Sequence, residues 1–147
     1  MTKIICKMLG ISFVVLGVIG FIMPGLLGTH LSPAHNLVHI ISGAVAMWFG
    51  WKGSPKAAKA FSLTFGAAYG LLGIAGFFAP PGMPSMAGME PSDHLLKVIP
   101  GVLELGTNDS ILHIIVGAIF LLAGFSKNKT AELPQQSTFT PPPKVGV

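Results

Sequence analysis

The chain has 147 residues, of which 51% are hydrophobic and only 10% are charged. A soluble domain carries about 25% charged residues, so these few charges cannot cover a soluble surface and lipid is the expected solvent. The formal charge of +4 comes from lysine without any arginine, which argues against nucleic acid as a partner because phosphate and base recognition favours arginine. The single cysteine, Cys6, excludes an intramolecular disulfide and a cysteine-based zinc site.

Four apolar runs follow one another along the chain, at residues 4–23, 33–51, 57–79 and 109–125. Each approaches the ~20 residues that a spanning helix needs, and inside hydrocarbon every backbone group must be hydrogen-bonded within the protein. The sequence therefore predicts an all-α integral membrane protein with four transmembrane helices in a domain over residues 1–126. The polar, proline-rich tail over residues 127–147 is predicted to be disordered.

Charge distribution predicts the orientation in the membrane. Eight of the nine lysines lie before or in the first turn of the first run, between the second and third runs or in the first turn of the third, or after the fourth, and only Lys97 falls in a loop on the other side. Four of the five acidic residues lie on the side of Lys97. The positive-inside rule then predicts cytoplasmic N- and C-termini and extracytoplasmic loops at residues 24–32 and 80–108.

Local signals predict where the helices begin and end. Ser32 followed by Pro33 is typical of an N-cap and first helical position, the stretch 107–110 offers several caps for the last helix, and Pro24 and Pro80 are predicted to end the first and third helices. Within the long outer loop, the cap and apolar spacing of residues 92–99 predict a short interfacial helix. Glu104, in the same loop, has no evident partner.

An internal repeat relates the two halves of the chain. The first and third runs share a glycine and aromatic pattern at an offset of 56, and the second and fourth share a His-Ile-Ile-x-Gly-Ala motif at an offset of 74, beginning at His39 and His113. The sequence therefore predicts two tandem helical hairpins related by a pseudo-two-fold axis along the membrane normal. Glycines recurring along each helix are expected to let the helix backbones approach closely.

Two histidines in membrane-length apolar runs need a physical reason. The favoured interpretation is that His39 and His113 stabilise the bundle by donating hydrogen bonds to a carbonyl or to a neighbour such as Asn36, Ser42 or Ser110. The alternative is a metal site, because His35 lies four residues before His39 on the same helix face and Asp109 takes the equivalent place before His113. Such a cluster suits zinc or copper, two histidines on separate helices could ligate haem b, and a proton-responsive cluster is a further possibility.

The outer loop carries a second candidate site. Met83, Met86 and Met89 form a Met-x-x-Met-x-x-Met motif, and His94 follows shortly after. Thioethers are soft ligands that select Cu(I), so this loop is a candidate copper site that resembles the methionine motifs of copper transport proteins. The simpler interpretation is that these methionines fill gaps against helix ends or lipid headgroups.

No catalytic constellation is visible. The sequence contains no nucleophile with a base, no phosphate-binding loop and no dinucleotide motif, so an enzyme is not expected. The leading hypothesis is a non-enzymatic structural or accessory subunit that packs against itself or against other membrane-protein subunits, with the lipid bilayer as its surroundings. The alternative is a metal- or haem-binding module, and no cofactor is assigned beyond the possibilities of copper, zinc or haem b.

The motifs resemble those of a known family. The Gly-Phe-x-x-Pro end of the first run at residues 20–24, the His-Asn-x-x-His-x-x-x-Gly start of the second at residues 35–43, and the later His113 with Gly117 are similar to small four-helix bacterial membrane proteins catalogued as a domain of unknown function. The resemblance covers about residues 7–125. It implies a four-helix fold and a bacterial inner or thylakoid membrane, and it implies no activity.

Overall fold

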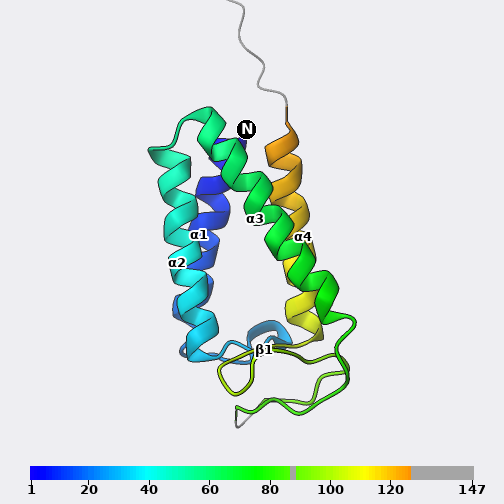
Figure 1. Cartoon of the computed structure of the whole chain (residues 1–147). Helices are drawn as coiled ribbons and strands as arrows, with labels where there is room; N and C mark the ends of the chain where they lie inside the picture. The colour runs from blue at the N-terminus through cyan, green and yellow to red at the C-terminus, as the bar shows by residue number, and fades with distance from the viewer. Residues whose placement is uncertain (87–88, 127–147) are drawn as a thin grey trace, which may run out of the picture.

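The computed structural model describes residues 1–86 and 89–126, and the tail predicted to be disordered lies outside this part (Figure 1). Four α-helices form the body of the protein: α1 (Thr2–Gly20), α2 (Pro33–Trp51), α3 (Pro55–Gly76) and α4 (Thr107–Phe125). A short 3-10 helix, η1 (Leu26–Gly28), lies between α1 and α2. The N-terminus and the end of α4 lie at one end of the bundle, here called the terminal end, and the segments 21–32, 77–86 and 89–106 lie at the other, the loop end (Figure 1).

Three of the four helices, α1, α3 and α4, are long and apolar enough to cross a membrane. At about 1.5 Å per residue, the 19 residues of α1 or α4 extend over roughly 28 Å, close to the thickness of the hydrocarbon core. The helix α2 has the same length, but polar side chains in its first half, among them His35, Asn36 and His39, lower its hydropathy. These helices suggest a membrane protein; four complete spans remain a prediction.

The helix α2 begins and ends as predicted, whereas α1, α3 and α4 begin two residues earlier than predicted. The hydroxyl of Ser32 accepts a hydrogen bond from the backbone N–H of His35 at 3.2 Å, as an N-cap does. The helices α1 and α3 end at Gly20 and Gly76, a few residues earlier than predicted, because turns at residues 21–23 and 77–79 precede Pro24 and Pro80. The prolines therefore follow the helix ends instead of setting them.

Glycines bring the helices of each hairpin into backbone contact. A Cβ atom added at Gly17 would lie 2.6 Å from the carbonyl oxygen of Asn36, and one added at Gly73 would lie 2.6 Å from the carbonyl oxygen of Ser110. Because Gly73 and Ser110 follow Gly17 and Asn36 by the two repeat offsets, α1–α2 and α3–α4 pack in the same way. Helices of different hairpins touch at far fewer places.

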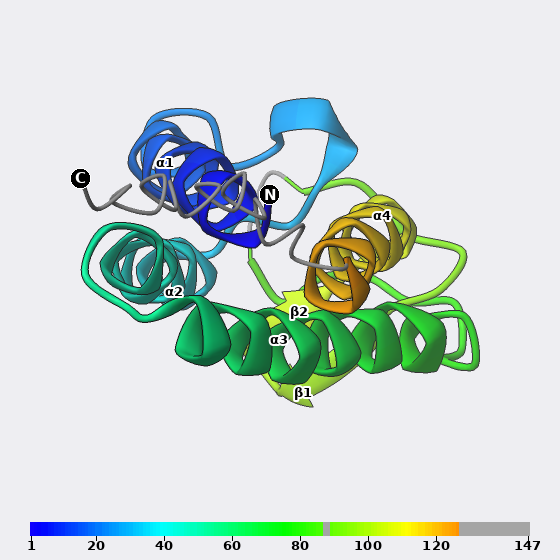
Figure 2. The same ribbon diagram turned by 90° about the horizontal axis from the view of Figure 1, so that it is seen from above.

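Equivalent residues of the two hairpins meet along the line between them. The rings of Phe13 and Tyr69 stack with centroids 5.3 Å apart, and those of His39 and His113 lie 6.4 Å apart. Towards the terminal end, the Cys6 thiol lies 3.3 Å from the hydroxyl of its counterpart Ser62. Figure 2 shows the two hairpins side by side when the bundle is viewed along its length. The centre of the protein is therefore built from matched pairs across a pseudo-two-fold axis.

The interfacial helix predicted over residues 92–99 is wrong. This part of the loop forms a two-stranded antiparallel hairpin of β1 (Leu96–Ile99) and β2 (Leu103–Leu105), so the fold is not purely α-helical. The turn between the strands contains Gly101 at φ +76°, a conformation that favours glycine and closes a hairpin. The apolar residues of this segment were too few to distinguish a helical from an alternating pattern.

Glu104 has several partners, contrary to the expectation from the sequence. Its carboxylate accepts hydrogen bonds at 2.7 Å from both the N–H and the hydroxyl of Ser85 and at 3.0 Å from the N–H of Gly101. The ammonium group of Lys97 lies 3.5 Å away. This ion pair offsets the charge of Lys97, the one lysine in a loop that is predicted to be extracytoplasmic.

We expect the β-hairpin to persist in moderate acid. Burial favours a higher pKa for Glu104, but the hydrogen bonds from Gly101 and Ser85 and the charge of Lys97 outweigh it and lower the pKa to about 2. A lowered pKa gives stability that is present above the ordinary value and is lost as the pH falls through the folded-state value. Amide hydrogen exchange at Ser85 and Gly101 should stay protected at pH 4, and loss of protection between pH 6 and 4 would contradict this prediction.

Candidate functional site

A cavity of about 170 Å³ lies between the two hairpins, near the loop end. All four helices contribute to its wall, and the segment after α1 covers it through Leu27, Thr29 and Leu31. Most of the wall is apolar, but it also contains three histidines and a carboxylate: His35, His39, Asp109 and His113. These are the four residues that the sequence predicted as a candidate metal-binding cluster, and the structure brings them together.

The three imidazole rings form a stack beside the pseudo-two-fold axis. The centroids of His35 and His39 are 4.5 Å apart, and that of His113 lies 5.9 Å from His35 and 6.4 Å from His39. Phe13 and Tyr69 pack against this stack on the side of the terminal end: the Phe13 ring is tilted against His39 with centroids 5.3 Å apart, and the Tyr69 ring meets His113 edge-on at 4.9 Å. Helix geometry explains the first pair, because residues four apart lie on the same face.

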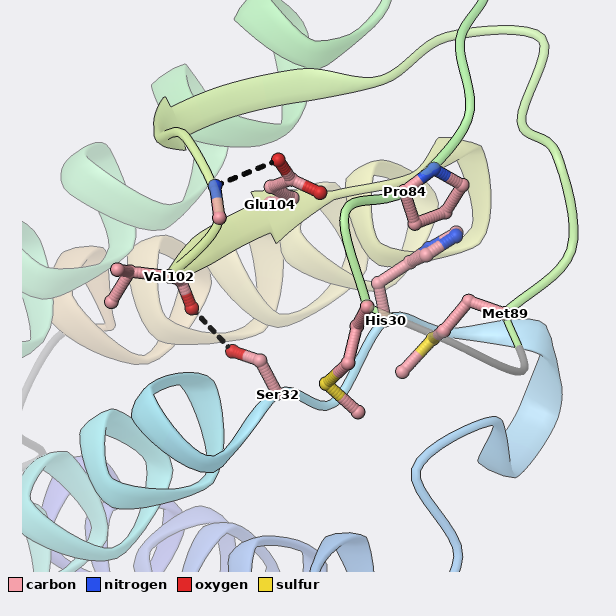
Figure 3. Close-up of a pocket in the computed structure, with 8 residues that line it drawn as sticks. His30, Ser32, Pro84, Met89, Val102 and Glu104 are labelled. Carbon is pink, nitrogen blue, oxygen red and sulfur yellow. Dashed lines mark hydrogen bonds between the residues drawn. The ribbon is translucent and has the colours of Figure 1, made fainter.

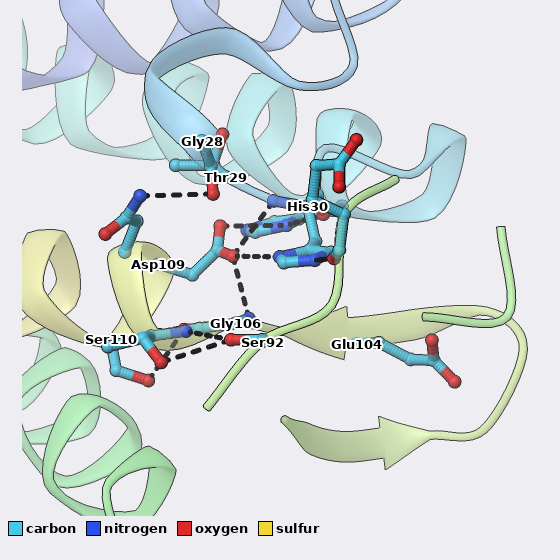
Figure 4. A network of polar contacts seen from close by, with 12 residues as sticks. Gly28, Thr29, His30, Ser92, Glu104, Gly106, Asp109 and Ser110 are labelled. Carbon is cyan, nitrogen blue, oxygen red and sulfur yellow. Dashed lines mark hydrogen bonds and ion pairs between the residues drawn. The ribbon is translucent and has the colours of Figure 1, made fainter. Parts of the chain in front are cut away.

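Asp109 connects the start of α4 to the loop that follows α1 (Figure 4). Its carboxylate oxygen Oδ2 accepts hydrogen bonds from the backbone N–H groups of His30 and Gly106 at 2.9 and 2.8 Å. The same oxygen lies 3.2 Å from Nδ1 of the His30 ring, and Oδ1 lies 3.9 Å from Nδ1 of His35. Asp109 is only 3% exposed, so its charge is compensated almost entirely by these protein groups.

His30 faces hydrogen-bond acceptors with both ring nitrogens. Its Nδ1 faces the Asp109 carboxylate, and its Nε2 lies 3.3 Å from the carbonyl oxygen of Glu90. A neutral imidazole has a single N–H, whereas the protonated ring has two. The hydrogen bond to Asp109 raises the pKa of His30 against the opposing effect of burial, and the Glu90 carbonyl raises it further. The geometry therefore suits an imidazolium paired with the carboxylate.

The His30–Asp109 pair predicts a loss of stability as the pH rises. Because the folded-state pKa of His30 is raised, its contribution is complete below about pH 6.5, the ordinary value, and disappears as the pH rises through the folded-state pKa. An NMR titration of the His30 ring should give a pKa above the ordinary value in the full chain and a lower pKa in Asp109→Asn. Equal values in the two proteins would contradict the assigned pairing.

The hydrogen-bonding role predicted for His39 and His113 is wrong as far as residues 1–86 and 89–126 are concerned. Neither ring bonds to a described residue, and the Nδ1 atoms of both are buried without a partner. His39 is 4% and His113 7% exposed. A buried polar atom without a partner costs about 1–3 kcal/mol. Both nitrogens are enclosed in the packed protein, so within the described residues each is an uncompensated cost.

The cofactors considered from the sequence fit this arrangement poorly. A haem is a drug-sized group, and pockets for such ligands measure about 300–1,000 Å³, well above the 170 Å³ present. In the described part of the chain, no three His, Cys, Asp or Glu side chains are arranged to hold a metal ion. The imidazole rings of the cluster stack on one another, whereas metal ligation requires their nitrogens to converge on one point. Zinc or copper binding by His35, His39, Asp109 and His113 stays a prediction.

The methionine loop is divided between two places. Met86 and Met89 line a small pocket together with His30 (Figure 3). Met83 is 63% exposed and does not line this pocket. Nδ1 of His94 lies 2.9 Å from the carbonyl oxygen of Ala79, and the ring packs against Phe77. The structure does not gather these four residues at one point, and copper binding by Met83, Met86, Met89 and His94 stays a prediction.

Two residues of the site were missed in the sequence. His30 lies in the first loop and has no counterpart in the second hairpin, so the repeat could not indicate it. The one available indication was that His30 lies two residues before the N-cap Ser32, close to the start of the helix that carries His35 and His39. The sequence marks Tyr69 only as part of the aromatic pattern shared by the first and third runs, although it carries the one phenol at the cavity, with its hydroxyl 3.4 Å from that of Ser42.

No family model, curated protein or solved structure matches this chain.

Proposed function

We propose that this chain is a non-enzymatic integral membrane protein whose two hairpins enclose a binding cavity for a small molecule. The observation that carries the proposal is the cavity of about 170 Å³ between the hairpins, whose wall is almost entirely apolar. Small ligands bind in cavities lined mainly by apolar side chains between the helices of a bundle.

The division of the packing supports the same proposal. Close backbone contacts hold each hairpin together, whereas the hairpins meet mainly through aromatic rings and the histidine stack. Ligand sites in helical bundles are built between helices, from side chains on facing helices. The space between two rigid hairpins is therefore a suitable place for a binding site.

The repeat provides a matched pair of variants to test this function. Leu112→Phe enlarges a half-buried side chain of the cavity wall, whereas Val38→Phe makes the same kind of change at its counterpart, which is 44% exposed and lies outside the wall. A ligand that binds only the folded state raises the unfolding temperature. Benzene added to the protein in detergent should raise that temperature for the unmodified chain and for Val38→Phe and not for Leu112→Phe. Equal shifts in all three proteins would refute the proposal.

The accessory-subunit hypothesis remains a second candidate for one reason. The β-hairpin, outside the helices, exposes three apolar side chains, Val98, Ile99 and Val102, at 43–52%. Contiguous exposed apolar patches mark contact sites for proteins or membranes, and in this second candidate function the three side chains contribute to such a site. Native mass spectrometry after gentle extraction tests this second role. It predicts a stoichiometric partner or a second copy of the chain, which is lost when Val98 and Val102 are both replaced by serine. A monomer in both proteins would leave the accessory role without support.

A further inference from the structure

The cavity between the hairpins is long and narrow. Its wall is formed on α1 by Leu9, Ser12, Phe13 and Leu16, and on α4 by four residues with the same spacing within 109–116. Each set extends over seven residues, which is about 10 Å along a helix axis. A cavity of about 150 Å³ accepts a single benzene, so a volume of about 170 Å³ that extends over two helical turns has a small cross-section. This shape suits a slender chain.

The cavity lies in one half of the length of the helices. Leu16 is about 6 Å from the loop end of α1 and Leu9 about 16 Å from it, whereas the midpoint of this 19-residue helix is at about 14 Å. The hydrocarbon core of a bilayer is about 30 Å thick, so that each leaflet contributes about 15 Å. The cavity therefore covers the depth at which the acyl chains of the leaflet at the loop end would lie.

The cavity opens sideways, between α1 and α4. Ser12 is exposed and Leu16 and Leu112 are half-buried, so the wall reaches the outer surface of the bundle at these residues. Thr29 and Leu31, by contrast, are buried where they line the cavity, and they close it towards the loop end. A ligand therefore enters from the side of the bundle.

The surface beside this opening is apolar. Val15 on α1 and Ile111 and Ile115 on α4, which adjoin wall residues in the sequence, are 42–49% exposed. The same two helices are among the three that are long and apolar enough to cross a membrane. In a bilayer, the groups available at such an opening are the hydrocarbon chains of lipids.

We infer that the cavity holds one acyl chain of a phospholipid from the leaflet at the loop end, which enters between α1 and α4. This inference rests on the proposed function and specifies its ligand. The chain lies against Phe13 and Tyr69, the two buried aromatic rings of the wall outside the histidine stack, and the headgroup stays at the membrane surface. Side chains that border a cavity lack van der Waals partners on one side, and an acyl chain supplies them without requiring a hydrogen bond.

The repeat indicates why the first hairpin has room for such a chain. Leu9 corresponds to Phe65 at the offset of 56. The Phe65 ring stacks on Phe61 and Tyr69 with centroids 4.9 and 4.7 Å apart, and so fills space that the smaller leucine leaves open. Leu9→Phe gives the first hairpin the side chain of the second, and should fill the deep end of the cavity.

The test uses the full chain in phosphatidylcholine nanodiscs. A small fraction of the lipid carries a diazirine in the middle of one acyl chain, which irradiation attaches to the side chains that it touches, and fragmentation mass spectrometry locates the attachment. We expect attachment at Phe13 or Tyr69, which are 4% and 6% exposed and which the surrounding lipid does not reach. Phe120 is 0% exposed and does not line the cavity, so it should remain unlabelled.

A matched pair of variants tests the route of the chain. Leu9→Phe should remove most of the attachment at Tyr69. Leu71→Phe makes the same substitution at a residue of α3 that is 67% exposed and lies outside the wall, and it should leave the attachment unchanged. Circular dichroism shows whether each variant folds. Leu16→Phe, at the opening, takes the place of Leu9→Phe if that variant does not fold.

The outcomes separate this inference from the proposed function. Attachment at exposed side chains alone, such as Leu71 and Leu122, would overturn the inference, because ordinary contact with the bilayer explains it. The proposed cavity function would then stand if benzene still raises the unfolding temperature in detergent. Attachment at Tyr69 that is unchanged in Leu9→Phe would also overturn the inference, because the chain would reach this residue by another route. Loss of both the attachment and the benzene effect would overturn both proposals.

Discussion

Replacing Asp109 by alanine is expected to destabilise the protein by about 3–5 kcal/mol, the usual cost of removing one partner from a buried ion pair. The variant would leave the N–H groups of His30 and Gly106 and the His30 ring without their shared acceptor. The free energy of unfolding in mixed micelles, followed by circular dichroism as the denaturing detergent is increased, measures the effect.

Asp93→Ala is the matched control. Asp93 is an exposed acid at the same end of the bundle, and surface substitutions of this kind change stability by less than about 0.5 kcal/mol. Asp109→Asn keeps the size of the side chain but sets an amide beside groups that donate, so it should fall between the two. A loss below about 1 kcal/mol for Asp109→Ala would show that the network in Figure 4 does not hold the loop to α4.

A single methyl group at Gly73 is expected to disturb the second hairpin strongly. The new Cβ atom would lie 2.6 Å from the carbonyl oxygen of Ser110 and 2.8 Å from the backbone nitrogen of Ile114. Since backbone atoms cannot move aside as a flexible side chain can, α3 and α4 must separate. Overpacking of this kind costs about 1–3 kcal/mol, measurable by the same unfolding titration.

Gly70 provides the control on the same helix. A Cβ atom at Gly70 would have no described atom within 4 Å, so Gly70→Ala should be neutral or should stabilise the helix by about 0.5–1 kcal/mol through its better propensity. Gly17→Ala in the first hairpin should behave like Gly73→Ala, because the contacts correspond. Similar stabilities for Gly70→Ala and Gly73→Ala would contradict close backbone packing.

The sequence predicted the parts of this fold that depend on long, regular patterns. Four apolar segments, the Ser32–Pro33 start of α2 and the glycines that face the partner helix all follow from periodicity and local chemistry. The loop between α3 and α4 was predicted less well, because a β-hairpin of a few residues depends on pairing partners such as Leu96 and Leu105 that no short pattern reveals.

The sequence predicted which residues form the candidate site, but it did not predict their hydrogen bonds. His35, His39, Asp109 and His113 could be grouped because the repeat and the helical period place them at one level. Their hydrogen bonds could not be predicted, because these depend on His30, which approaches from a loop whose path the sequence does not determine. The unpartnered nitrogens are likewise visible only when all neighbours are in place.

The pairing of neighbouring helices also bears on how the protein is made. Because α1 packs on α2 and α3 on α4, nearly all the close backbone contacts join segments that are consecutive in the chain. Local contacts form quickly, and an early segment can complete its own packing while later ones are still being synthesised. The first hairpin is therefore expected to assemble as a unit during translation, and the histidine stack to be the last part of the protein to form.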